Sequence, residues 1–466
     1  MSVRFSYFAL WLTIASPAQA SIFELFGAGP RGTATAGALT AAAEGGEAAF
    51  HNPAMLMAAP LAGAWVAATA TQSRLFVNLQ RPVCTGTYLT CQAQNPDGFS
   101  TRAATLPRDT LAWSAGWHYP LGGVLRNRMA LGMALALPNG HIIRISGSDP
   151  QSPNFPLYEG MPERLAFLFA LAGAVTDKVW AGVGVQVLAT LNAAIDLRVN
   201  ATNHTMDRAN IAIGLQPQTG VVAGVVCAPS RLLRFGVSFR QHISLQYGIP
   251  SDVHLGDSAL LGIALSHQAL YTPDIFNFGT AWQPSELLKL SADLTWARWS
   301  TAPDPSPQVA LDVQGPAVTA FGLQDIVDVG TDTKPIALGF RDTWSPAVAA
   351  QWQASPQWAV RAGYRYRPTP APRATGPFKY LDSDTHIAAA GLSYRFGTLA
   401  PRLLAKLAQA GTQPHETPSA FHVDLGAQYQ ALNRRLAVAA DPNDPVGPLE
   451  HGGGVWHANL GFGGSF

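Results

Sequence analysis

Charged residues are scarce in this chain of 466 residues. Asp, Glu, Lys and Arg together make up 13%, whereas soluble proteins carry about 25%. The 30 basic and 29 acidic residues leave a net charge of +1, so nucleic acid is not an expected partner. With 48% hydrophobic residues, the composition favours an apolar environment.

Long hydrophobic runs are also missing after the first twenty residues. The longest apolar run, 165–175, has about eleven residues, which is too short for a helix across a bilayer but suits a tilted strand of ~9–11 residues. Glycine (44 residues) and proline (35 residues), which interrupt helices, are abundant. Low charge without long apolar helices is typical of a membrane β-barrel.

Cysteine is rare, and sequence motifs for catalysis are missing. Cys84 and Cys91 lie in one polar loop, where a local disulfide is one option, and Cys227 lies in an apolar strand as a small hydrophobic residue. No Gly-x-Ser-x-Gly or Cys-x-x-Cys occurs, and His415-Glu416 lacks the second His of a zinc protease. We expect no enzyme, no metal site and no cofactor.

The first twenty residues have the features of a secretory signal peptide. Arg4 supplies the positive end, residues 7–15 supply a short apolar core, and Ala18-Gln19-Ala20 fits the small-x-small cleavage rule. The alternative is a buried N-terminal helix, which would not need the cleavage triplet. Cleavage would make Ser21 the first mature residue, in an exported protein.

The last thirteen residues, 454–466, alternate with a strict period of two. One face is apolar with aromatic residues at both ends, and the other is polar or bare, so the segment is predicted to be a strand between lipid and a wet lumen. The alternative is the edge strand of a soluble sandwich. The apolar face consists of Trp456, Ala458, Leu460, Phe462, Gly464 and Phe466.

Further strands pair into hairpins with short turns on one side and long polar loops on the other. Together they predict an all-β fold, a transmembrane antiparallel β-barrel of about 14 strands. The predicted strands are 61–79, 112–119, 129–137, 165–175, 179–189, 211–227, 232–247, 275–282, 287–299, 346–353, 358–366, 387–396, 421–431 and the last strand.

Several strands place charged residues on a single face. An Arg on the lipid face costs roughly 2–4 kcal/mol near the midplane, so these faces are predicted to line the lumen. Arg240, Arg361 and Arg365 are candidates for holding a substrate carboxylate. The alternative is an internal charge network that pairs such arginines with Asp424 or Asp293.

Residues 21–60 are rich in Gly and Ala and end in Asn52-Pro53-Ala54, directly before the first predicted strand. Such small residues make a poor soluble core, but they would pack tightly as short helices and turns inside a barrel. The predicted organisation is a signal peptide (1–20), an N-terminal hatch (21–60) and a β-barrel (61–466).

These features resemble the FadL family, the outer-membrane transporters of long-chain fatty acids and aromatic hydrocarbons such as toluene. The resemblance rests on the Gly/Ala-rich opening with Asn52-Pro53-Ala54, on the paired strands 273–300, and on 341–364 followed by 382–385. It covers nearly the whole mature chain. Residues 397–419 depart from it with a long, partly helical connection, predicted as a periplasmic insertion.

The resemblance implies a function and site residues. Hydrophobic molecules would enter passively through an apolar groove, pass a lumen site and a hatch gated by Asn52, Pro53 and Ala54, and leave sideways through the wall. The opening would lie at Pro138-Asn139-Gly140, where Pro and Gly predict a broken strand or simply a strand's end. Phe466 would be the assembly signal.

The expected location is the outer membrane of a Gram-negative bacterium. The expected partners are a hydrophobic small molecule, outer-membrane lipid and lipopolysaccharide, and the barrel assembly machinery, with the protein acting as a monomer. A general diffusion porin is an alternative function, although the small-residue hatch argues against an open lumen. An outer-membrane barrel lipase or adhesin is another.

Overall fold

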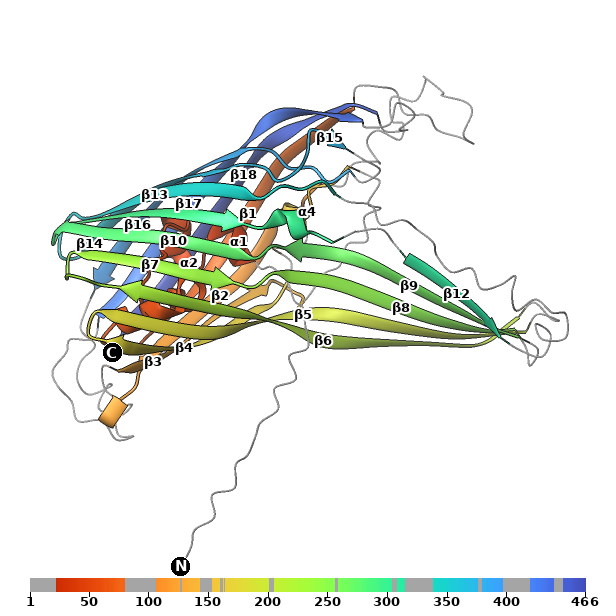
Figure 1. The fold of residues 1–466 in the computed structure, drawn as a ribbon, viewed down its shortest axis with the longest axis horizontal. Coiled ribbons are helices and arrows are strands. Elements are labelled where there is room, and N and C mark those ends of the chain that lie inside the picture. Colours follow the sequence, from red (N-terminus) through yellow and green to blue (C-terminus); the bar gives the residue numbers. More distant parts are fainter. Residues whose placement is uncertain are drawn as a thin grey trace, which may run out of the picture.

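The computed structural model shows a closed β-barrel with short helices inside it (Figure 1). It describes residues 22–79, 106–125, 128–142, 153–159, 162, 164–200, 205–255, 259–303, 308–314, 338–375, 379–396, 420–439 and 447–466. The predicted signal peptide 1–20, Cys84, Cys91 and the predicted insertion 397–419 lie outside these residues.

Eighteen strands of the described chain form one continuous sheet, and fourteen of them close into the barrel wall. Closure occurs because β1 pairs with both β2 and β18, and the β1–β18 seam runs from Gly63↔Ser465 to Leu79↔Leu449. The prediction of an antiparallel 14-stranded barrel is confirmed. The wall strands are β1 (Gly63–Leu79), β2 (Thr110–Pro120), β3 (Met129–Pro138), β4 (Ala166–Thr176), β5 (Val179–Asn200), β6 (Thr205–Cys227), β7 (Leu233–Arg240), β10 (Ile275–Ser285), β11 (Leu288–Ala297), β13 (Thr343–Gln353), β14 (Trp358–Arg367), β16 (Thr385–Phe396), β17 (Ala420–Ala439) and β18 (Leu449–Ser465).

The outward face of the wall is apolar and carries aromatic residues at two levels. On β13, Trp344 and Trp352 are both about half exposed, and the two positions are eight residues apart, which is about 26 Å along a strand. This distance along a tilted strand matches the apolar band of an outer-membrane barrel, which is flanked by aromatic girdles. Trp344 stacks near Trp296 at 6.0 Å, and at the other level Trp358 lies 4.5 Å from Tyr394.

The predicted facing of the last strand and of the arginine-bearing strands is confirmed. On β18, Leu460 is 55% exposed on the outside whereas His457 and Asn459 are 2% exposed and face the lumen. On β14, Val360 is outward and Arg361 is buried inside. Side chains alternate between the two faces of a strand, so a charged run of period two can only lie on the lumen face.

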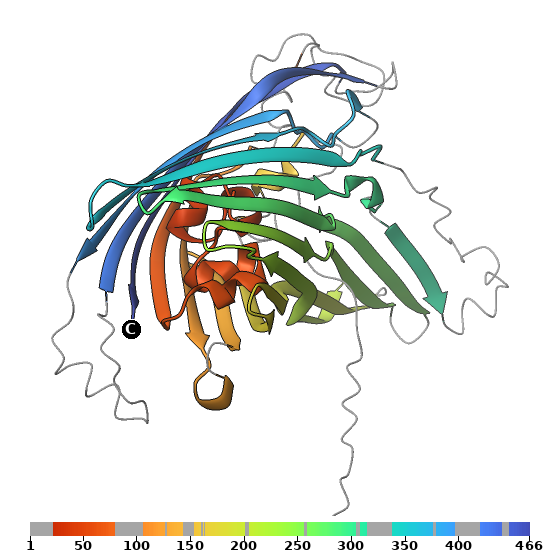
Figure 2. The same cartoon turned by 60° about the vertical axis from the view of Figure 1, so that its left-hand side comes forward.

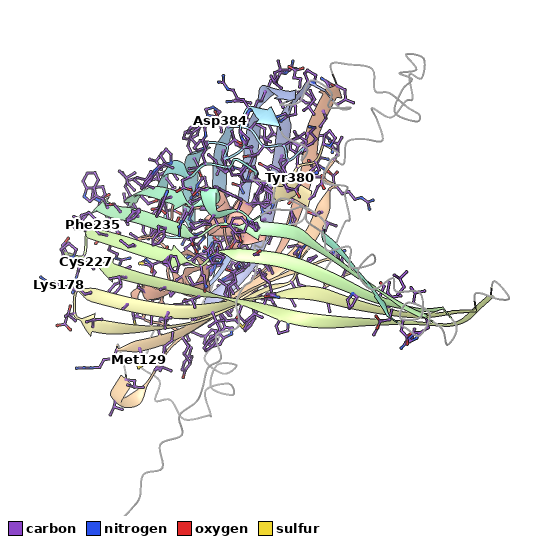
Figure 3. The ribbon with its side chains drawn as sticks, turned by 45° about the vertical axis from the view of Figure 1, so that its right-hand side comes forward. Met129, Lys178, Cys227, Phe235, Tyr380 and Asp384 are labelled. Atoms are coloured by element: carbon purple, nitrogen blue, oxygen red, sulfur yellow. The ribbon has the colours of Figure 1, made fainter. Side chains whose placement is uncertain are left out.

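Short turns lie at one end of the barrel and longer connections at the other, as predicted. Figure 3 shows Lys178, Cys227 and Phe235 together at the short-turn end, while Tyr380 and Asp384 lie toward the opposite end. Cys227 is an exposed free cysteine at the end of β6.

Beyond the barrel, β5 and β6 continue into a second region that we call the wing. The wing comprises residues 189–200 and 205–219 of β5 and β6 with β8 (Ile243–Leu255), β9 (Ala259–Thr272) and β12 (Gln308–Gln314), and it projects away from the rim (Figure 1). These additional strands were not predicted. The two-residue strand β15 (Ala374–Thr375) pairs in parallel with β17.

The prediction of one strand over 232–247 is wrong. The strand stops at Arg240, and the backbone N–H of His242 donates to the Asp274 carboxylate at 2.7 Å. The chain leaves the wall at this turn and returns at β10, so β7 pairs directly with β10.

The hatch fills the lumen with short helices (Figure 2). None of the described helices is long and apolar enough to cross a membrane. The core lies between the hatch and the inner wall, where Phe26, Met55 and Leu56 are fully buried. The hatch helices are α1 (Ile22–Phe26), α2 (Gly29–Ala34), η1 (Gly45–Glu47), α3 (Ala48–His51) and η2 (Pro53–Ala58); outside the hatch lie η3 (Gly123–Leu125), α4 (Pro156–Glu159) and η5 (Trp299–Thr301).

Candidate functional site

Glycines on the inner wall let the hatch backbone approach the strands closely. A Cβ added to Gly363 would lie 2.4 Å from the carbonyl carbon of Thr35, and one added to Gly426 would lie 2.2 Å from the carbonyl oxygen of Pro30. We call the wall glycines at which an added Cβ would come within 3 Å of a hatch atom the glycine belt. The belt comprises Gly132, Gly182, Gly224, Gly236, Gly279, Gly363, Gly391, Gly426 and Gly461.

Asn52 joins the hatch to the wall from a fully buried position. Its side-chain Nδ2 donates to the carbonyl of Thr40 at 2.9 Å and approaches the wall carbonyls of Val237 and Val225 at 3.4 and 3.5 Å. Its Oδ1 accepts from the backbone N–H of Ala54 at 3.1 Å, which caps η2.

Pro53 occupies the first position of η2, where the absent N–H costs nothing. The structure therefore brings the three predicted gate residues Asn52, Pro53 and Ala54 together against β5 and β6. Gly182 and Gly224 are the wall positions that make room for them.

Two titratable side chains inside the hatch are held in their neutral forms. Burial lowers the pKa of His51 to about 3, and its Nε2 accepts from the backbone N–H of Ala28 at 3.4 Å. Burial raises the pKa of Glu47 to about 8, and its Oε1 accepts from the backbone N–H of Arg31 at 3.3 Å. Both side chains therefore accept backbone hydrogen bonds that tie the hatch turns together, and burial favours their neutral forms.

Ion pairs fix the hatch to the wall near the short-turn end of the barrel. Asp424 on β17 lies 3.4 Å from Arg31 of the hatch and 3.5 Å from Arg361 of β14, and Ser393 bridges Arg361 and Asp424. Lys289 pairs with Glu44 at 2.8 Å. The charge-network interpretation thus holds for Arg361, which is engaged away from the cavity described next.

A cavity of about 140 Å³ lies on the other side of the hatch, between α1 and the wall strands β7, β10, β11, β13 and β14. Phe23, Phe26, Phe50 and Ile275 provide apolar walls, and Leu157 of α4 closes one side. Three guanidinium groups also line it, those of Arg240, Arg365 and Arg367. The cavity therefore offers an apolar compartment with a cationic end.

Two of the three predicted arginine candidates reach this cavity, and their environments differ. Arg240 pairs with Glu24 of α1 at 3.2 Å, donates to the Phe50 carbonyl at 2.7 Å and lies 3.7 Å above the Phe50 ring. Arg365 donates Nε–H to the Ala36 carbonyl at 2.8 Å, and no ion pair joins it to a carboxylate of the described residues. Arg365 is therefore the arginine best placed to accept an anionic group.

Arg367 has the same inward parity on β14 as Arg361 and Arg365, but it was not among the predicted site residues. Its Nη2 donates to the Tyr158 hydroxyl at 2.8 Å and to Thr385 at 3.2 Å, and it lies 3.5 Å from Asp382. Tyr158 in turn donates to Gln430 at 2.8 Å. The alternation on β14 could have identified Arg367. Its partner Tyr158 belongs to α4, and no sequence pattern indicated that this connection enters the lumen.

The wall is interrupted where Pro138, Asn139 and Gly140 lie. Strand β3 ends at Pro138, and its ladder with β4 stops at the pair Ala136↔Ala166. The next contact is made by the adjacent residue of β4, since the N–H of Leu165 donates to the carbonyl of Ile142 at 2.8 Å. Residues 137–141 therefore leave the β3–β4 ladder as an excursion.

The space around Gly140 in this excursion is open. Gly140 has a φ of +81°, and nothing lies within 4 Å of the position of an added Cβ. The backbone N–H of Asn139 still donates to the carbonyl of Leu111 on β2 at 2.9 Å, so the break is confined to the β4 side. Among the described residues, no cluster of His, Cys, Asp or Glu could hold a metal ion.

Comparison with known proteins identifies the family. The sequence pattern of the family described as outer membrane protein transport protein (OMPP1/FadL/TodX) matches residues 11–401. The chain belongs to this family. The resemblance noted in the sequence is confirmed, and OMPP1/FadL/TodX membership places the protein in the Gram-negative outer membrane as a transport protein for hydrophobic compounds.

Relatives of this family agree with the fold over nearly the full length. Alkane uptake protein A of Marinobacter nauticus is 22% identical over 473 residues, covering 95% of this chain and 92% of its own. The crystal structure of a Pseudomonas aeruginosa FadL homologue is 16% identical with a TM-score of 0.58, covering 94% of this chain and 98% of its own. The P. putida toluene transporter TodX is 13% identical with a TM-score of 0.50, covering 95% and 99%. These relatives are transport proteins, which supports a role without catalysis.

Proposed function

We propose that the lumen cavity binds an amphiphile with a long apolar chain and a carboxylate, as a long-chain fatty acid has, during passive transport. The observation that carries this proposal is Arg365, a half-buried guanidinium that lines the cavity and makes no ion pair with a carboxylate of the described residues. The charge of Asp293 acts on it without a direct ion pair, so the guanidinium keeps donors that a carboxylate ligand could accept from. Arg240 already has Glu24, and Arg361 already has Asp424.

The test compares palmitate with hexadecane, which have similar chains and differ in the carboxylate. Purified protein should bind palmitate, and Arg365→Gln should weaken that binding by about 10- to 150-fold, the loss of one hydrogen bond to a charged group. Binding of hexadecane should not change. Arg395→Gln, an exposed arginine on the neighbouring strand β16, is the matched control. Equal palmitate affinity in Arg365→Gln and wild type would exclude Arg365 as the carboxylate site.

A hydrocarbon without a carboxylate is the second candidate substrate. The observation that favours it is the 22% identity to an alkane uptake protein over 95% of this chain. In that case the arginines would only neutralise Glu24 and Asp382, and hexadecane would bind at least as tightly as palmitate in the same assay.

The proposed exit is sideways through the excursion 137–141. The hatch is fixed to the wall by Asn52, by the ion pairs of Asp424 and Lys289 and by the glycine belt, so displacement of the whole hatch would break many buried contacts. A gap in the wall avoids that cost. Its position next to Leu165 and Ile142 supports an opening between β3 and β4.

Deletion of residues 137–141 tests this route. It joins Ala136 to Ile142, whose partners Ala166 and Leu165 are adjacent, and so makes the β3–β4 ladder continuous. Uptake should fall while ligand binding in detergent persists. Asn139→Ala, which leaves the excursion in place, is the control, and a heat-dependent shift in gel mobility verifies that each barrel is folded. Unchanged uptake after the deletion would favour a path through a displaced hatch.

A further inference from the structure

The wing extends far beyond the part of the barrel that a membrane requires. Strand β4 ends its pairing with β5 at Leu188, and β7 pairs with β6 only from Val222 to Cys227. A strand of about 11 residues already crosses the bilayer. The further residues 189–200 add about 40 Å of strand at ~3.3 Å per residue, and the wing projects outward from the rim (Figure 1).

The strand register divides the wing into an apolar and a charged face. Pairings Ile195↔Ile211, Leu197↔Val253, Val253↔Leu261 and Ile263↔Leu311 put aliphatic residues on one face across all five strands. We call this the apolar wing face. Asp207 lies at the register shift of β6, and the other face carries Asp196, Arg198, Arg208, Asp252, His254 and Asp312. There His254 lies 3.6 Å from Asp196 across the β5–β8 pair.

The apolar wing face is the direct continuation of the lipid-facing surface of the barrel. Val183 and Val185 of β5 are exposed on the outer wall, and Ile195 and Leu197 have the same parity farther along this strand. The β5–β6 ladder runs without a register shift from Val179 to Arg198, so the face does not switch between these points.

The wing is a single layer in the described part of the chain. Among the described residues, β8, β9 and β12 adjoin other strands of the same sheet, and the helix η2 meets β5 in the barrel part, at Gly182. A sheet with an apolar face is normally covered by a second layer, and a large apolar face without one marks an interaction site.

The composition of the apolar wing face indicates which partner covers it. Interfaces for proteins are enriched in aromatic residues, Met and Arg at their centres. The apolar wing face is mainly Ile, Leu and Val, as the outer barrel wall is at Val183 and Val225, and the same register adds Tyr247, Ser251 and His267. A mainly aliphatic surface suits a disordered aliphatic liquid, which needs no specific shape.

We propose that the apolar wing face adsorbs to the surface of a water-immiscible aliphatic liquid outside the cell. The polar outer surface of the membrane cannot cover it, because the wing begins where the apolar band of the barrel ends. Adsorption brings the rim of the barrel to the liquid surface, independently of which compound then enters the lumen.

The test measures partition of the full-length protein in lipid nanodiscs into a hexadecane-in-water emulsion. Ile211→Lys and Ile263→Lys place a charge on the apolar wing face, and Asn210→Lys and Ala264→Lys place the same charge one residue away on the opposite face. Wild type and the opposite-face variants should collect at the droplets. Each lysine on the apolar wing face should reduce the partition by about tenfold or more, because a lysine resists transfer to hydrocarbon.

A fluorescence measurement keeps the proposal testable if a lysine variant fails to fold. In a protein with Cys84, Cys91 and Cys227 replaced by Ser, a polarity-sensitive dye is attached at Ile211→Cys or at Asn210→Cys. Hexadecane droplets should shift the emission to the blue at position 211 and leave position 210 unchanged. Equal shifts at both positions, or equal partition of all lysine variants, would overturn the proposal.

The same dye separates a second copy of this chain from the liquid. If emission at position 211 shifts with protein concentration in the absence of hexadecane, the face is a contact between copies and adsorption is refuted. Neither assay involves uptake, so a negative result does not bear on the proposed lumen site. Likewise, a failure of the palmitate-binding test does not bear on adsorption by the wing.

Discussion

Replacing Asn52 by Ala should loosen the hatch while the barrel remains closed. In the structure, Asn52 is fully buried, donates to the carbonyl of Thr40 and accepts from the N–H of Ala54. Alanine supplies neither the donor nor the acceptor. The wall strands keep their own ladders, so the change acts on the contact between hatch and wall.

The expected cost can be built from two lost interactions. Loss of a helix N-cap costs about 0.5–2 kcal/mol. A buried carbonyl without a donor, here that of Thr40, costs about 1–3 kcal/mol. Together they reduce the free energy of hatch opening by roughly 1.5–5 kcal/mol, which raises the open population by about tenfold to several thousandfold.

Hydrogen exchange measures this population directly. Amides that open locally exchange in proportion to the open fraction, so the N–H groups of Ala54, Met55 and Leu56 should exchange faster in Asn52→Ala by the same factor. Exchange in the β1–β18 seam should not change. Asn139→Ala is the matched control, because Asn139 is exposed at the end of β3. If the hatch amides of Asn52→Ala exchange at the wild-type rate, Asn52 does not hold the hatch to the wall.

Three further changes have defined outcomes. Gly363→Ala should lower the urea midpoint by an amount equivalent to about 1–3 kcal/mol, because the added Cβ would collide with the hatch backbone. Gly173→Ala is the control and should leave the midpoint unchanged, because its Cβ would make an ordinary contact at 3.5 Å. Asp424→Asn removes the carboxylate between two guanidinium groups and should destabilise the protein by roughly 3–5 kcal/mol. Asp109→Asn changes an exposed ion pair with Arg74 and should cost about 0–1 kcal/mol. Equal urea midpoints for the two variants would contradict the buried network. Deletion of Phe466, which is 57% exposed at the end of β18, should reduce the heat-modifiable protein in the membrane without affecting export, and normal insertion would argue against an assembly signal.

The sequence was sufficient for the barrel because lipid imposes a simple rule on each strand. An outward Arg is expensive near the bilayer midplane, so the alternation around Val360 and Arg361 determined facing without knowledge of the neighbours. Outside the hydrocarbon this rule ends. β8, β9 and β12 are aliphatic strands interrupted by residues such as Pro250, and the pairing of β8 with β5 and of β12 with β9 depends on contacts far apart in the chain.

From the sequence, the candidate site could be predicted only as the lumen-facing side of the strands. Alternation identified Arg361, Arg365 and Arg367 as lumen residues, but it could not say which of them has a partner. Arg361 is neutralised by Asp424, which lies two strands away on β17, and Arg365 is not close enough to any described carboxylate to pair. Such differences depend on distances of a few ångström across the lumen.

The glycine belt has a consequence for the order in which this protein is built. The hatch immediately precedes β1, and β1 is one side of the seam that closes the barrel against β18. Because an added Cβ at belt glycines on nine wall strands would come within 3 Å of hatch atoms, the hatch fits closely against the inner wall. We therefore expect the hatch to pack on the open sheet before the β1–β18 seam forms. A chain that closed its seam first would leave Asp293 and Asp424 without the hatch groups that they contact in the structure.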